Sequence, residues 1–182
     1  MDEHPDQAGE LAPEVGVPDL VALCRLLNEA GVQYLVYGGL ACLLHGHERM
    51  TRDADLYVGP DRENIKRTLE ALGRWGQGYA SELTADDVIE NVVVRIADTF
   101  VVDVAAEVWK LEWRTAWSRR RISLVDGVEI PFLSRQDLIT SKLTYRERDR
   151  WDREILDGMK GPEPGHAAIL DSGFWILDSF IL

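Results

Sequence analysis

Two aspartates, Asp53 and Asp55, are separated by one residue in a segment that alternates polar and apolar side chains. This alternation predicts a β-strand, which places both carboxylates on one face while Ala54 and Leu56 point into a core. Two carboxylates this close repel each other unless a cation lies between them. The pair therefore predicts a site for a divalent metal ion, although a solvated strand face or ion pairs to neighbouring arginines would also explain it.

A glycine pair, Gly38 and Gly39, precedes the aspartates in the sequence. Glycine at the end of a strand lets the backbone turn sharply and approach a ligand closely. The helix expected to begin there would present free N–H groups and the positive end of its dipole, which suits a phosphate. A plain tight turn without a ligand is the alternative interpretation. The segment is not a P-loop, because no Gly-Lys-Ser/Thr follows the glycines.

Asp103 is the best candidate for a third carboxylate. It lies among valines in FVVDVAAEV, within a β-rich run. A lone aspartate in such a strand is costly unless it is paired or ligating. We therefore expect Asp103 to complete a set of three acids, while Glu107 lies nearer the end of the strand.

Apolar periodicity and turn signals predict the elements that position these residues. In chain order they are a helix over 19–30, a strand over 33–37, a short helix over 40–44, a strand over 54–58, a helix over 61–72, β-runs over 91–97 and 99–105, a hairpin of 121–125 with 128–132, and helices from 134 onward. This order predicts a mixed α/β (α+β) fold, with helices flanking a mixed sheet and a small C-terminal helical lobe. Trp109, Trp113 and Trp117 recur at helical spacing, and we expect them to face the core.

Composition divides the chain into four segments. We expect a disordered acidic tail over 1–17, a core over 18–133, a helical segment over 134–160, and a linker with an apolar tail over 161–182. Cys24 and Cys42 lie in apolar stretches and are expected to be buried free thiols. The polar N-terminus is no signal peptide and no stretch approaches a membrane span, so we expect a soluble cytoplasmic protein without a membrane partner.

The net charge is −12, from 20 basic and 32 acidic side chains. Such an excess argues against general binding of nucleic acid. The charge is uneven, however, because residues 110–153 hold 11 basic against 7 acidic side chains. A local patch for a polyanionic partner is therefore compatible with the sequence.

The segment YGGLACLLHGHERMTRDADLYV, residues 37–58, resembles the signature of the nucleotidyltransferase superfamily, which has the polymerase-β-like fold. It is most similar to small bacterial members with a GG-x-A…R-x-T-x-D-x-D pattern, such as the AbiEii-type toxins of toxin–antitoxin systems. The aminoglycoside and lincosamide nucleotidyltransferases are more remote. Asp103 follows in the expected place, and PFLSRQDLITSKLTYRERDRWDREI resembles the C-terminal helical stretch of the superfamily.

This resemblance implies which residues would act. The catalytic and metal-binding acids would be Asp53, Asp55 and Asp103. The nucleotide-binding residues would be Gly38, Gly39, Arg49, Thr51 and Lys142. Two Mg²⁺ ions would bridge the triphosphate of an NTP and stabilise the attacking and leaving oxygens.

The resemblance implies transfer of an NMP from an NTP to an acceptor hydroxyl, with release of pyrophosphate. The favoured acceptor is RNA, particularly a tRNA 3′ end, which would make the protein a toxin with a cognate antitoxin as partner. One alternative is an enzyme that modifies an aminoglycoside or lincosamide antibiotic. Another is a non-catalytic antitoxin or binding member of the fold. The base of the NTP and the oligomeric state stay open.

Overall fold

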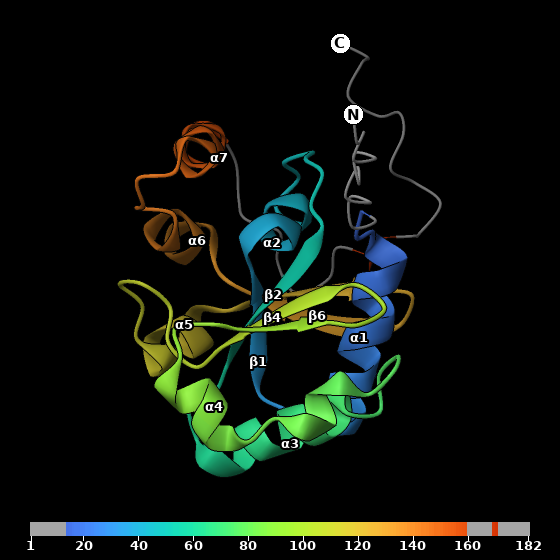
Figure 1. Ribbon diagram of the computed structural model, residues 1–182. Coiled ribbons are helices and arrows are strands. Elements are labelled where there is room, and N and C mark those ends of the chain that lie inside the picture. Colours follow the sequence, from blue (N-terminus) through green and yellow to red (C-terminus); the bar gives the residue numbers. More distant parts are fainter. Residues whose placement is uncertain (1–13, 160–168, 171–182) are drawn as a thin grey trace, which may run out of the picture.

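The computed structural model describes residues 14–159 and 169–170. Its centre is a seven-stranded mixed sheet in the order β3-β4-β2-β1-β6-β5-β7 (Figure 1). The strands are β1 (Tyr34–Tyr37), β2 (Asp53–Val58), β3 (Val94–Ala97), β4 (Val101–Ala105), β5 (Arg121–Val125), β6 (Val128–Phe132) and β7 (Ile169–Leu170). The helices are α1 (Val17–Glu29), α2 (Gly38–Leu44), α3 (Arg62–Leu72), the 3₁₀ turn η1 (Tyr79–Glu82), α4 (Ala85–Glu90), α5 (Trp113–Arg119), α6 (Arg135–Ser141) and α7 (Glu147–Gly158). The mixed α/β fold predicted from the element order is confirmed.

Local turn and cap chemistry explains why several elements begin and end where predicted. The β5–β6 hairpin turns at Asp126 and Gly127, which both have positive φ, as a two-residue hairpin turn requires. Helix α3 begins after Asp61, whose carboxylate accepts hydrogen bonds from two free backbone N–H groups. Ser134 caps α6 with its hydroxyl, which accepts a hydrogen bond from the backbone N–H of Asp137.

Helices α1 and α3 pack against each other and against β6 and β2, respectively. Ala54 and Leu56 of β2 are fully buried in the main apolar cluster. Alternation along β2 turns Asp53 and Asp55 to the opposite face of the sheet. That face is the one on which the candidate site forms.

Helices α6 and α7 pack together as the predicted helical lobe, and α6 also contacts α2 (Figure 1). Leu138 of α6 and Leu156 of α7 are fully buried in the apolar cluster of the sheet. The lobe is therefore anchored to the core by apolar contacts as well as by the polar contacts described below.

The chain ends lie only partly within the described residues. Of the tail expected over 1–17, the structure describes the last four residues: Val15 is buried, its N–H donates to the carbonyl of Thr51, and α1 begins at Val17. Of the segment expected over 161–182, it describes only β7, which pairs in parallel with β5. The rest of both segments lies outside the described residues.

The prediction that three tryptophans lie along one helix and face the core was wrong for the first of them, Trp109. Trp109 lies outside α5 and its side chain is exposed, because the next residue, Lys110, has a φ of 60° that no helix accepts. Trp113 and Trp117 do lie on α5 and stack on each other against the core. Both cysteines are buried free thiols, as predicted. Within the described part of the chain, no helix has the length and apolar character needed to cross a bilayer.

Candidate active site

Strand pairing brings the three predicted acids to one place. Strand β2 runs parallel to β4, with Asp55 directly beside Asp103 and Asp53 beside Val101. Paired residues in neighbouring strands share a face, so all three carboxylates point to the same side of the sheet. Asp53 and Asp103 are diagonal neighbours there.

Asp55 carries the strongest electrostatic signature of the three acids. Its pKa is raised to about 7, first by burial and then by the negative charges of Asp53 and Asp103. Lys142 and a hydrogen bond from the backbone of Gly39 act in the opposite direction but do not cancel the rise. Burial and the two neighbouring carboxylates therefore both oppose ionisation of Asp55.

Gly38 and Gly39 are needed because their neighbours leave no room for a side chain. A Cβ at Gly38 would collide with the carboxylate of Asp55, and its φ of +62° also disfavours other residues. A Cβ at Gly39 would lie 2.5 Å from Oγ1 of Thr51 and 3.2 Å from Nη2 of Arg49. The glycine turn thus packs directly against the acids and against two of the predicted nucleotide-binding residues.

We expect Gly38→Ala to damage the site far more than Gly31→Ala does. Both glycines have nearly the same φ, +62° and +66°, but nothing lies within 4 Å of a Cβ at Gly31. Both substitutions cost about 1–2 kcal/mol through the left-handed backbone, whereas only Gly38→Ala also displaces Asp55. Thermal melts and titration with Mn²⁺ measure the difference. Equal losses in the two variants would contradict this account of Gly38.

Thr51 fixes the orientation of Asp53. The Thr51 side chain is buried, and its Oγ1 donates to Oδ1 of Asp53 over 2.9 Å. Asp53 is held at the start of β2 with about a third of its side chain exposed. This acid is therefore positioned by a neighbour and still open to a ligand.

Arg95, which the sequence did not single out, contacts two of the acids. It lies opposite Asp103 in the β3–β4 pairing, and its guanidinium donates to both oxygens of Asp103, from Nε at 2.9 Å and from Nη2 at 2.7 Å. Nη2 also lies 3.6 Å from Oδ2 of Asp53. The hydrogen bond to Asp103 is the main reason that the pKa of Arg95 is raised.

A second buried group of charges joins the helical lobe to the site. Asp152 of α7 contacts Arg49, accepts a hydrogen bond from Lys142 at 2.7 Å, and lies 3.2 Å from Nε2 of His47. We call these four residues the Asp152 cluster. Burial alone would raise the pKa of Asp152, but Lys142 and the other two partners outweigh burial and lower it. Asp149 lies 3.5 Å from Lys142 at the edge of the cluster.

The donor chemistry of the site fits a magnesium ion, since carboxylate oxygens are the ligands that Mg²⁺ prefers. As the side chains stand, however, no three acidic, histidine or cysteine side chains among residues 14–159 and 169–170 converge closely enough to hold a metal. Nη2 of Arg95 lies 2.7 Å from Oδ2 of Asp103 and 3.6 Å from Oδ2 of Asp53, so its charge stands beside both acids. The three acids fit the metal provided that Arg95 moves.

The predicted site residues are thus brought together to different degrees. The three acids, the two glycines, Arg49 and Thr51 form one contiguous group. Lys142 acts on Asp55 electrostatically, but its Nζ is bound by Asp152 rather than free. Arg95 and Asp152 were missed as site residues: Arg95 depends on strand register, and the only signal for Asp152 was its place in the charged run after Lys142.

A cavity of about 690 Å³ opens further along the same strands. Its walls include Tyr57, Trp109, Trp113, Glu107 and Glu112. Tyr57 follows Asp55 by two positions and so shares its face of the sheet. Burial, and then the charges of Glu112 and Glu107, raise the pKa of Tyr57 to about 12. One wall of the cavity, Tyr57, therefore lies about two strand residues, roughly 7 Å, from Asp55.

A family described as "Nucleotidyltransferase of unknown function (DUF6036)" matches residues 20–157 of the chain. Among curated proteins, no sequence matches at a significant level. Two solved structures have similar folds. One is an antigenic nucleotidyltransferase-like protein from Paracoccidioides brasiliensis, with 17% identity, a TM-score of 0.52, and coverage of 79% of this chain and 78% of that one.

The other is the lincosamide antibiotic adenylyltransferase LnuA in its lincomycin-bound crystal structure. It has 13% identity and a TM-score of 0.53, over 81% of this chain and 100% of that one. At these identities both similarities establish the fold.

Proposed function

The chain belongs to the DUF6036 family of nucleotidyltransferases of unknown function, and from this membership we propose that it transfers an NMP from an NTP to an acceptor hydroxyl. The observation that carries the proposal is the set of three carboxylates, Asp53, Asp55 and Asp103, on one face of neighbouring strands beside the glycine turn. Nucleotidyl transfer leaves little covalent chemistry to the protein, so catalysis rests on positioning and on neutralising charge.

In the proposed reaction, the acceptor hydroxyl oxygen attacks the α-phosphorus of the NTP. The bond from that phosphorus to the oxygen bridging to the β-phosphate breaks, and pyrophosphate leaves with this oxygen. The acceptor keeps the NMP as a phosphodiester. Asp103 accepts the proton that the hydroxyl of the acceptor releases. Asp103 suits this role because its carboxylate lies beside Asp55 on the next strand.

Mg²⁺ would be held by Asp53, Asp55 and Asp103, and when bound it would neutralise the triphosphate and the developing charge on the attacking and leaving oxygens. Thr51 keeps Asp53 oriented through its hydrogen bond. Gly38 and Gly39 carry no side chain and would let the backbone of the turn approach the phosphates closely.

Arg49 and Lys142 would contribute positive charge on the phosphate side. Arg49 reaches to within 3.2 Å of the Cβ position at Gly39, and Lys142 acts on Asp55. Asp152 holds both cations and therefore sets where they stand. The phosphate side of the site thus depends on a residue of α7.

RNA, with a tRNA 3′ end as the specific case, is the acceptor that we propose first. It is supported by the excess of basic side chains over residues 110–153 and by the resemblance of the GG…R-x-T-x-D-x-D segment to toxin-type members. A toxin of this kind would be held in check by an antitoxin protein. Expression in bacteria would then arrest growth in the wild type and not in Asp53→Ala.

A small-molecule acceptor is the second candidate, and the cavity beside Tyr57 favours it. A volume of about 690 Å³ is suited to a drug-sized ligand. Aromatic walls with nearby carboxylates suit a cationic organic molecule that bears a hydroxyl. LnuA, which shares the fold, is an antibiotic adenylyltransferase whose structure contains lincomycin.

The test is incubation with each of the four α-³²P-labelled NTPs and Mg²⁺, in separate reactions with total RNA and with a panel of hydroxylated cationic compounds. We expect label to move to an acceptor in the wild type and not in Asp53→Ala. Label on RNA supports the first acceptor, and label on a small compound supports the second. Equal, background labelling in the wild type and Asp53→Ala in every reaction would contradict nucleotidyl transfer and favour a binding role.

A further inference from the structure

Arg95 links two of the acids. Its guanidinium forms two hydrogen bonds to Asp103 and lies 3.6 Å from Asp53. The side chain of Asp103 is only 7% exposed, and a carboxylate buried to this degree is costly without a partner. Arg95 therefore supplies the partner that offsets the burial of the Asp103 carboxylate.

The same guanidinium would compete with a metal ion for these acids. A cation held by Asp53 and Asp103 would bind carboxylate oxygens that Arg95 now contacts. A guanidinium and a divalent ion at the same oxygens would also repel each other. Metal binding and the Arg95–Asp103 contact therefore compete with each other.

Arg95 is well placed to leave Asp103 without disturbing the core. It belongs to β3, the edge strand of the sheet, and its side chain is 61% exposed. Once released, the guanidinium stays at the rim of the site with its planar fork of donors free. Such a fork binds phosphate oxygens in pairs.

We propose that Arg95 is the counter-ion of Asp103 and Asp53 in the metal-free protein, and that metal binding transfers its guanidinium to the phosphates of the NTP. This inference rests on the proposed function. It makes Arg95 a residue with two successive partners. In the first state it competes with the metal, and in the second it helps to hold the nucleotide.

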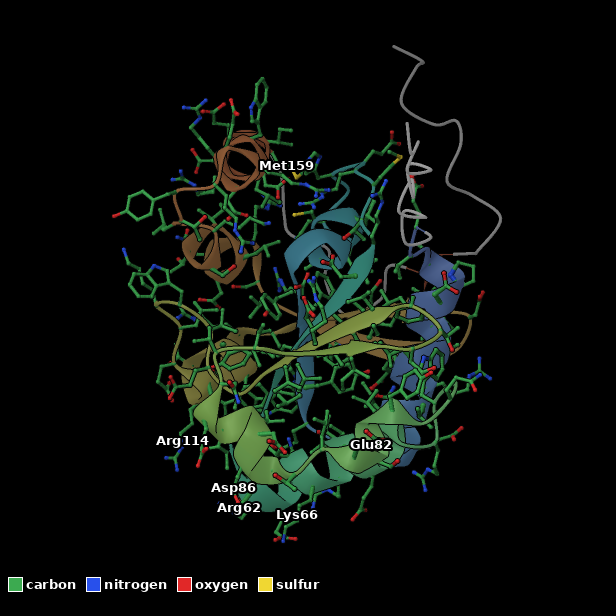
Figure 2. All side chains as sticks on the ribbon, in the orientation of Figure 1. Arg62, Lys66, Glu82, Asp86, Arg114 and Met159 are labelled. Atoms are coloured by element: carbon green, nitrogen blue, oxygen red, sulfur yellow. The ribbon has the colours of Figure 1, made fainter. Side chains whose placement is uncertain are left out.

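The first measurement is calorimetric titration of the metal-free protein with Mn²⁺ alone. In Arg95→Gln the competing cation is gone, so we expect Mn²⁺ to bind about tenfold more tightly than in the wild type. Arg62→Gln is the matched control. Arg62 also pairs with an aspartate, Asp86, and this pair joins α3 to α4. Figure 2 shows the pair at the opposite end of the molecule from Met159, the residue that follows α7. The Mn²⁺ affinity of Arg62→Gln should equal that of the wild type.

The second measurement is binding of a non-hydrolysable NTP analogue at saturating Mn²⁺. Here we expect Arg95→Gln to bind about tenfold more weakly, because the phosphates lose a guanidinium. Arg95→Lys keeps the positive charge but lacks the planar fork of donors. Its affinities for Mn²⁺ and for the analogue should lie between those of the wild type and Arg95→Gln. A merely structural role for Arg95 would weaken both affinities together, so opposite shifts identify the proposed role.

Two results would overturn the proposal. Mn²⁺ affinity that is unchanged or weaker in Arg95→Gln would remove the counter-ion role, and unchanged affinity for the analogue would remove the phosphate role. Melting curves of Arg95→Gln and Arg95→Lys show which variants are folded, and either folded variant decides the matter. If the wild type transfers no nucleotide while the opposite shifts are found, the proposed function fails and the role of Arg95 stands.

Discussion

Replacing Asp55 with asparagine is expected to abolish nucleotidyl transfer and, at the same time, to stabilise the metal-free protein. Activity should fall roughly 10³-fold, since one pre-organised charge is lost where charge develops in the transition state. Stability should rise at pH 8, because the carboxylate is buried beside Asp53 and Asp103 and its charge is opposed by both. Opposite signs in activity and stability are typical of a residue kept for function.

The pH dependence of stability provides a separate measurement for Asp55. Its pKa is about 7 in the folded protein and about 4 when unfolded. The folded state therefore binds more protons between these values, so stability is fully present below about pH 4 and is lost as the pH rises through 7. Thermal melts of the metal-free wild type should show this loss, and melts of Asp55→Asn should show less of it.

Asp86→Asn is the matched control for Asp55→Asn. Asp86 is an exposed aspartate paired with Arg62, so its replacement removes a carboxylate with little effect on the acids. We expect it to leave nucleotidyl transfer unchanged. If Asp55→Asn retained wild-type transfer, or lowered the melting temperature at pH 8 as a core substitution would, the role given to Asp55 would be wrong.

Local chemistry explains which parts of the fold were predictable. The β5–β6 hairpin agrees with its predicted ranges because Asp126-Gly127 accepts the two positive φ values of the turn. The α3 start follows in the same way from the capping carboxylate of Asp61. Trp109 shows the limit of such local prediction. The spacing of the tryptophans predicted one helix, but the left-handed backbone of Lys110 separates Trp109 from that helix.

Strand register explains what the sequence could not give at the site. Asp103 was expected to join Asp53 and Asp55 from its place among valines, and the resemblance agreed, whereas the contact of Arg95 with Asp103 was not expected at all. Arg95 faces the acids only because β3 and β4 pair in one register. A shift of one residue would turn its side chain to the other face. The pairing depends on long-range packing, which no short motif records.

Lys142 shows the same limit for helices. The resemblance implied that Lys142 would approach the phosphates from a helix. In the structure, α6 ends one residue before Lys142. Its actual partner, Asp152, comes from the following helix, and its distance from Lys142 depends on how α6 and α7 pack. Sequence spacing alone did not show that these two residues would meet.

Asp152→Asn is expected to cause the largest loss of stability of the substitutions considered. Asp152 is buried and accepts from Lys142 and Arg49, whose side chains are 7% and 13% exposed. Removing its charge leaves two largely buried cations without their main partner. Such a loss costs about 3–5 kcal/mol, which urea or thermal unfolding measures. The affinity for NTP should fall as well, because both cations lose their fixed positions.

Two further variants separate the cluster from general damage to α7. Asp149→Asn removes the outer carboxylate, 3.5 Å from Lys142 and partly exposed, and should cost less than about 1 kcal/mol. Adding Lys142→Met to Asp152→Asn removes one of the stranded cations and should restore part of the lost stability. If Asp152→Asn were as stable as Asp149→Asn, the cluster would not anchor the lobe.

The loss of stability in Asp152→Asn should depend on pH in a defined direction. The pKa of Asp152 is lowered in the fold, because Lys142, Arg49 and His47 together outweigh the effect of burial. Its contribution is therefore present above the unfolded pKa of about 4 and is lost as the pH falls through the lower folded value. The stability gap between the wild type and Asp152→Asn should be wide at pH 7 and should narrow below pH of about 4. A gap of constant size over this range would mean that shape, and not the charge of Asp152, holds α7 against the site.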